Sequence, residues 1–125
     1  MLLDSNILIY SLLPEYTALR QWCFHQQVCV SSITQLDVLG YHQLNETDKS
    51  DLSHLFELTI IYPIDGVIIN RAISLRQQKK MSVGDAIIAA TALEYTQTLV
   101  TRNKKDFEWI NGLKVIDPLE DINDD

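Results

Sequence analysis

Three aspartates carry the clearest chemical signal in this chain. Asp4 follows a short apolar run at the N-terminus, Asp37 lies early in an expected helix, and Asp85 begins the most apolar expected helix. Carboxylate oxygens are the ligands that Mg²⁺ and Mn²⁺ prefer. A cation held between carboxylates can activate a water molecule and clamp a phosphate group for in-line attack. The three residues are therefore candidate metal ligands for phosphodiester hydrolysis, provided that the fold brings them together.

Each aspartate also has a purely structural interpretation. Thr34 and Asp37 have the spacing of a helix capping box, and Ser82 and Asp85 repeat it. Asp4 could form an Asx turn. Three carboxylates within about 5 Å of one another would repel by roughly 3 kcal/mol per pair at an effective dielectric constant of about 20. A divalent cation offsets that repulsion better than a nearby Arg or Lys does, so the coincidence of three acids favours the metal site.

Short apolar runs alternate with helical patterns along the chain. The apolar runs predict buried strands, and the segments between them have the apolar spacing of helices. Strands are expected at residues 1–3, 28–31, 59–64, 98–101 and 114–116, the last one stopped by Pro118. Helices are expected at residues 6–13, 17–27, 34–44, 47–58 with Thr47 as N-cap, after Asp65 as N-cap, and at 83–95 with Ser82 as N-cap.

This alternation predicts an α/β protein with a central parallel sheet of about five strands and helices on both faces. The carboxyl ends of parallel strands meet at one edge of the sheet, where ligand sites form. All three aspartates fall at such ends, and so does the polar segment Thr-Arg-Asn-Lys-Lys-Asp at residues 101–106. Within that segment Arg102, Lys104 and Lys105 adjoin the expected site, where phosphate contact and plain solvation are equally compatible with the sequence.

Two other groups of residues have simpler interpretations. Arg76, Lys79 and Lys80 lie near the end of an expected helix, where a favourable interaction with the helix dipole explains them without RNA. Trp22 and Trp109 are expected in the core or in a dimer contact rather than as surfaces for stacked bases.

Size and composition narrow the class of protein further. A chain of 125 residues predicts one domain, residues 1–125, whose acidic tail at about 120–125 is expected to fray. The net charge of −7 argues against a protein that holds nucleic acid by charge alone. No apolar run approaches the ~20 residues of a membrane span. Cys23 and Cys29 have neither metal-site spacing nor a disulfide framework, which suggests the cytoplasm.

Four segments together resemble the PIN-domain family, and specifically VapC-type toxins of type II toxin–antitoxin systems. They are LLDSN at residues 2–6, SITQLDVLG at 32–40, GDAIIAATA at 84–92 and LVTRNKKDF at 99–107. Their order and spacing make the resemblance specific, and it extends over nearly the whole chain. It implies a PIN-like three-layer α/β/α sandwich and a ribonuclease that depends on Mg²⁺ or Mn²⁺. It also implies an RNA substrate, a cognate antitoxin and a homodimer.

The resemblance assigns roles to individual residues. The family's metal-binding acids fall on Asp4, Asp37 and Asp85, and its fourth polar position falls on Asn103, with Asp106 close by. Asn103 or Asp106 would complete the catalytic group. The remaining candidates, all for substrate binding, are Ser5, Asn6, Thr101, Arg102, Lys104 and Lys105.

One position departs from the family pattern. The second acid is normally Glu and here is Asp37, which is one methylene shorter. The alternative function is therefore a catalytically degenerate PIN domain that binds RNA or protein. A phosphoacceptor receiver domain would share the sheet and the acidic pocket. It would, however, have paired acids after the first strand and a Lys after the last, where this chain has Asp4 alone and Asp117.

Overall fold

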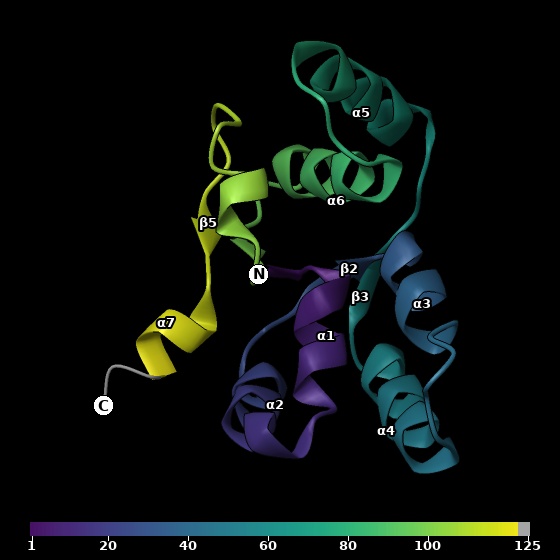
Figure 1. The fold of residues 1–125 in the computed structure, drawn as a ribbon. Coiled ribbons are helices and arrows are strands. Elements are labelled where there is room, and N and C mark those ends of the chain that lie inside the picture. The colour runs from purple at the N-terminus through teal and green to yellow at the C-terminus, as the bar shows by residue number, and fades with distance from the viewer. Residues whose placement is uncertain (123–125) are drawn as a thin grey trace.

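A computed structural model describes residues 1–122. It consists of a five-stranded sheet surrounded by helices (Figure 1). The strands are β1 (Leu2–Leu3), β2 (Cys29–Ser31), β3 (Ile60–Tyr62), β4 (Leu99–Val100) and β5 (Val115–Ile116). The α-helices are α1 (Ser5–Ser11), α2 (Thr17–His25), α3 (Ser32–Leu39), α4 (Glu46–Glu57), α5 (Gly66–Gln78), α6 (Val83–Glu94) and α7 (Pro118–Ile122), with 3₁₀ turns at Pro14–Tyr16 and Lys104–Asp106.

The sheet confirms the expected parallel arrangement. Its strand order is β3-β2-β1-β4-β5, and every neighbouring pair is parallel. β1 lies in the centre, where Leu2 pairs with Cys29 of β2 on one side and with Leu99 of β4 on the other. The chain order runs outward in both directions from β1. This is the point at which open parallel sheets form ligand sites.

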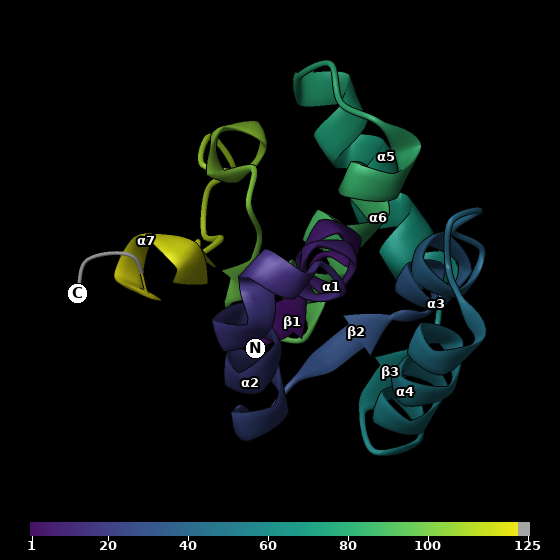
Figure 2. The same ribbon diagram turned by 60° about the horizontal axis from the view of Figure 1, so that its bottom comes forward.

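Alternating side chains of the short strands build a core on each face of the sheet. Leu2 and Leu99 pack with α5 and α6, whereas Leu3 and Val100 pack with α1, α2 and α4. Figure 1 shows the sheet between these two groups of helices, and Figure 2 shows α3 and α4 together on one side of the molecule and α7 on the other. The expected three-layer α/β/α sandwich is confirmed.

Of the described helices, α6 has the largest number of buried residues. Seven of its residues are buried, from Ala86 to Ala92. Ser82 caps it as expected, because the Ser82 hydroxyl accepts a hydrogen bond from the Asp85 backbone N–H at 3.0 Å. The expected cap of α5 is also confirmed, since Asp65 accepts from the N–H of Ile68 at 3.0 Å.

Several helix boundaries differ from the expectation by a few residues. The helix expected at 34–44 begins at Ser32, with Ser31 as its N-cap, and ends at Leu39. Gly40 follows as the C-cap, at a position where a side chain would collide with the Leu36 carbonyl oxygen. The next helix is capped by Asn45 rather than Thr47. The Asn45 side chain accepts from the N–H of Asp48 at 2.7 Å, and asparagine is at least as good an N-cap as threonine.

The C-terminal segment also differs. Pro118 does not only stop the last strand but begins α7, a position that suits proline because its fixed φ is helical. Residues 120–122 of the acidic tail belong to this helix. The rest of the tail, 123–125, lies outside the described residues. None of the helices in the described part of the chain has both the length and the apolarity that a membrane span needs.

Candidate active site

The candidate site forms at the carboxyl ends of the central strands. Asp4 directly follows β1, Thr101 directly follows β4, and Asp37 lies in α3, which follows β2. Asp85 lies in the first turn of α6. The parallel sheet therefore brings together residues that are as much as 97 positions apart in the sequence, as the contact between Asp4 and Thr101 shows.

Asp4 is the most buried of the three aspartates, with 5% of its surface exposed. Its Oδ2 accepts a hydrogen bond from the Thr101 hydroxyl at 2.7 Å, and Thr101 Oγ1 in turn accepts from the Asn103 backbone N–H at 3.1 Å. Asp4 occupies the N-cap position of α1, yet its side chain makes no capping hydrogen bond. The carboxyl group is therefore turned toward the site and not toward its own helix.

Burial is the main reason why the pKa of Asp4 is raised from 3.8 to about 6. The Thr101 hydroxyl and the Ser5 backbone N–H lower this pKa, whereas the negative charges of Asp85 and Asp37 raise it. Burial and two neighbouring carboxylates thus disfavour the charged form of Asp4, and a bound cation would stabilise that form.

The side chain of Ser5, the residue after Asp4, holds Asp37 in place. The Ser5 hydroxyl donates to Asp37 Oδ2 at 2.8 Å and lies 3.2 Å from Thr34 Oγ1. Thr34 is fully buried within α3, so the capping-box interpretation of Thr34 and Asp37 is wrong. The shorter acid at this position thus has a defined hydrogen-bond partner.

The carboxyl group of Asp85 is half-buried. Its pKa is raised first by burial and then by the negative charges of Asp106 and Asp37, while a hydrogen bond with the Ser82 side chain lowers it. Asp85 and Asp106 both line a cavity of about 580 Å³. The other residues that line this cavity are Arg76, Lys79, Lys80, Met81, Ser82, Lys105 and Trp109.

Two of the candidate substrate contacts already have partners within the chain. Arg102 forms an ion pair of 2.8 Å with Asp117, which is buried, and Lys104 lies 3.3 Å from Glu120. The Arg102 backbone N–H donates to Asn6 Oδ1 at 3.5 Å. This geometry favours a structural role for the Arg102 guanidinium and leaves Lys105 as the base of the polar segment that lines the cavity.

The ligand chemistry of the site fits a hard divalent cation. Among residues 1–122, no three carboxylate, imidazole or thiol groups lie close enough together to form a complete ligand set. Mg²⁺ does not need one, because it usually keeps several waters and binds through one or two carboxylates and the substrate's phosphate. Asp4 and Asp85, whose charges disfavour each other, are the pair that fits this pattern best.

Comparison with known proteins identifies the family. Many enzymes have a parallel α/β sheet with acidic residues at its switch point, so the fold and the site define only a broad class. A family model is more specific: the PIN domain model matches residues 1–112. The chain therefore belongs to the PIN-domain family, which confirms the resemblance seen in the sequence.

Individual relatives cover nearly the whole chain. Ribonuclease VapC1 of Rickettsia felis is 28% identical over 127 residues, which cover 93% of this chain and 94% of that protein. A toxin–antitoxin complex from Klebsiella pneumoniae contains a chain with 33% identity and a TM-score of 0.77, with coverage of 94% and 96%. FitAcB from Neisseria gonorrhoeae matches at 25% identity and a TM-score of 0.71, with the same coverage.

The sequence did not reveal several residues of the site. Thr101, a candidate substrate contact, donates a hydrogen bond to Asp4, and Arg102 pairs with Asp117, a residue outside the predicted set. Lys79 and Lys80 were assigned to the helix dipole, but they line the same cavity as Asp85. Both lysines lie only a few positions before Asp85 in the sequence, but nothing in a basic run indicates which cavity its side chains will line.

Proposed function

We propose that this chain is a metal-dependent endoribonuclease, the toxin of a VapBC-type toxin–antitoxin pair. The observation that carries the proposal is the buried carboxyl of Asp4 at the carboxyl ends of the central strands, whose pKa is raised mainly by burial and further by the charges of Asp85 and Asp37. Membership of the PIN-domain family and the likeness to Ribonuclease VapC1 support the same activity.

The residues of the site divide the work of hydrolysis. Asp4, Asp37 and Asp85 would hold Mg²⁺ or Mn²⁺, directly or through water. The bound cation would supply Lewis-acid chemistry, polarising the phosphate and lowering the pKa of a water molecule. Thr101 orients Asp4, and Ser5 orients Asp37, through their hydrogen bonds of 2.7 and 2.8 Å. Asn103 or Asp106 would orient the attacking water.

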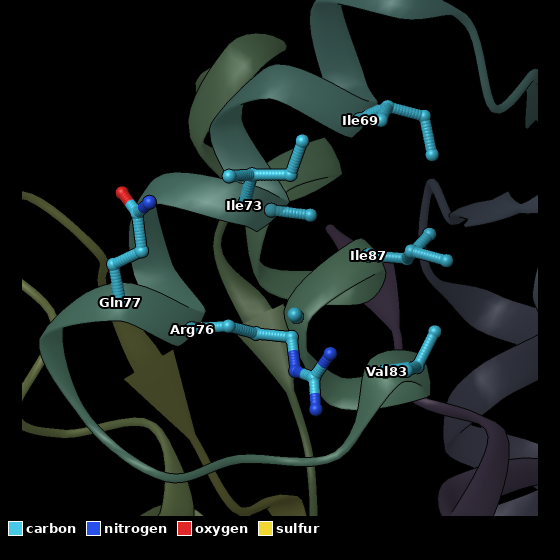
Figure 3. A pocket seen from close by; sticks show the side chains of 8 residues that line it. Ile69, Ile73, Arg76, Gln77, Val83 and Ile87 are labelled. Carbon is cyan, nitrogen blue, oxygen red and sulfur yellow. The ribbon is translucent and has the colours of Figure 1, made fainter.

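We also propose that the protein binds an antitoxin and forms a homodimer in the cytoplasm. The Klebsiella pneumoniae relative was solved as a toxin–antitoxin complex, which supports the first partner. An apolar groove of about 370 Å³ between α5 and α6 supports the second (Figure 3). Ile69, Ile73 and Val83 line the groove and are 41%, 51% and 56% exposed, so a second copy would bury them.

The test is cleavage of RNA by the purified chain with Mg²⁺, with Mn²⁺ and with EDTA. We expect cleavage with either cation and none with EDTA. Asp85→Asn should abolish cleavage, because it removes a ligand charge while it keeps the shape and the backbone N–H that Ser82 caps. Glu15→Gln is the matched control, since it also removes one negative charge but from an exposed residue of the Pro14–Tyr16 turn that does not line the cavity with Asp85.

The same assay distinguishes the nuclease from the alternative function, a catalytically degenerate PIN domain. A chain that binds RNA but does not cut it with either cation would be a degenerate PIN domain, with Asp37 as the first residue to examine. Wild-type cleavage in EDTA, or full activity of Asp85→Asn, would contradict the proposal.

A further inference from the structure

The cavity beside Asp85 is lined by an unusual concentration of positive charge. Four of the chain's ten Lys and Arg residues, Arg76, Lys79, Lys80 and Lys105, line it, although the chain has a net charge of −7. We infer that this basic cleft binds the single-stranded RNA next to the bond that is cut. In this inference Lys79, Lys80 and Lys105 contact phosphates and Trp109 stacks on a base. The inference rests on the proposed function and extends it to residues outside the acidic site.

The basic side chains of the cleft are available for a ligand. Elsewhere in the protein Arg20, Arg71 and Arg102 form ion pairs of 2.6, 2.7 and 2.8 Å with carboxylates. Within the residues that the structure describes, the four basic side chains of the cleft form no such ion pair, even though Asp85 and Asp106 line the same cavity. The cleft therefore keeps its positive and negative charges apart. This arrangement suits a ligand whose phosphates bind the Lys and Arg side chains, while the aspartates remain available to a cation.

Trp109 offers a fixed aromatic surface in this cleft. Its indole N–H donates to the carbonyl oxygen of Asp106 at 2.9 Å, and this bond ties the ring to the segment that carries an acid of the site. The Lys79 ammonium lies 5.6 Å from the ring centroid. The ring is half-buried, so part of it faces solvent. An aromatic ring beside lysines is the combination that binds single-stranded nucleic acid without reading its sequence.

The segment that carries the lysines is anchored. Lys79 is the C-cap of α5, and Lys80 follows it in the short connection to α6. Arg76 Nε donates to the carbonyl oxygen of Met81 at 3.1 Å, which ties this connection back to α5. Figure 3 shows the Arg76 side chain extending from α5 toward the start of α6, where Val83 lies. The helix dipole explains why lysines are tolerated here, but not why they share a cavity with Trp109 and two acids.

Binding of a single-stranded RNA oligonucleotide, followed by fluorescence anisotropy in EDTA, tests the phosphate contacts without cleavage. Lys79→Ala combined with Lys80→Ala should weaken binding about 10-fold or more and lower the dependence of log K on log salt by about 1 to 2. The matched control is Lys49→Ala with Lys114→Ala, which makes the same change in net charge at residues that do not line the cleft. The control should bind within about 2-fold of wild type.

Tryptophan fluorescence tests the stacking surface directly. The chain has two tryptophans, so Trp22→Phe leaves Trp109 as the only one. The oligonucleotide should quench emission of this variant and leave that of Trp109→Phe, which retains Trp22, unchanged. Trp109→Ala should weaken binding about 10-fold, whereas Trp109→Phe should keep most of the affinity because a phenyl ring still stacks.

Three results would overturn the inference. They are wild-type affinity of the Lys79 and Lys80 double variant, absence of quenching of Trp109, and equal competition by polyglutamate of matched charge, which would mark the cleft as a site for acidic peptide. Failure of the proposed function is a different result: RNA bound through the cleft but not cut with Mn²⁺ keeps the cleft as an RNA-binding site and removes the nuclease. If the double variant cuts RNA normally, the nuclease is kept and the role of the cleft is removed.

Discussion

Asp4→Asn should make the metal-free protein more stable at neutral pH. In the folded protein the pKa of Asp4 is raised from 3.8 to about 6, mainly by burial. A shift of about two units corresponds to about 3 kcal/mol at a pH above both pKa values. Asparagine keeps an oxygen that can accept from the Thr101 hydroxyl, so the substitution removes the charge and little else. The expected gain in the free energy of unfolding is therefore up to about 3 kcal/mol.

The pH dependence of this gain follows from the direction of the shift. Between pH 3.8 and about 6 the folded wild type binds a proton at Asp4 more tightly than the unfolded chain does. Wild-type stability therefore falls as the pH rises through this window and levels off above it. The advantage of Asp4→Asn should be small near pH 4 and largest above pH 6. Millimolar Mn²⁺ should reverse the order, because it stabilises only a chain with an intact site.

Urea denaturation in EDTA at a series of pH values from 4 to 8 measures the effect. Glu15→Gln is again the control, since it makes the same change in net charge at an exposed residue and should shift stability by less than about 0.5 kcal/mol. A variant Asp4→Asn that is less stable than wild type at every pH, or whose advantage does not change with pH, would refute the reasoning. The carboxylate of Asp4 would then stabilise the fold, and no cation would be needed to explain its burial.

Three further predictions concern the surroundings of the site. Thr101→Val should cost about 1–2 kcal/mol, more above pH 6 than below, because the fully buried hydroxyl donates to a carboxyl that is then charged; urea denaturation measures it. Arg102→Met should cost about 2 kcal/mol by leaving the buried Asp117 unpaired, with thermal melting as the readout. Ile73→Glu, at a side chain that is 51% exposed, should give monomers in sedimentation and keep the circular-dichroism spectrum of the folded chain; a dimer would remove the groove as the interface.

The architecture and the principal acids can be predicted from the order of the residues. Period and polarity of the apolar runs predicted the parallel sheet, because a strand buried on both faces leaves a short continuous apolar run whatever surrounds it. Asp4 could be placed after the first strand for the same reason. Ser82 and Asp65 were predicted as helix caps because a cap involves residues only three positions apart. The four family segments then indicated which acids belong together.

The interactions that those residues make depend on the folded structure. The hydrogen bond from Thr101 to Asp4 spans 97 positions, and that from Ser5 to Asp37 spans 32, so neither leaves a local pattern. The raised pKa of Asp4 likewise depends on burial and on distant charges, which a sequence does not state. Lys79 shares a cavity with Asp85 because α5 packs against α6, and that packing angle is set by many apolar contacts at once. Interactions within one turn of helix can be predicted from neighbouring residues, whereas those across the sheet exist only once the whole core has formed.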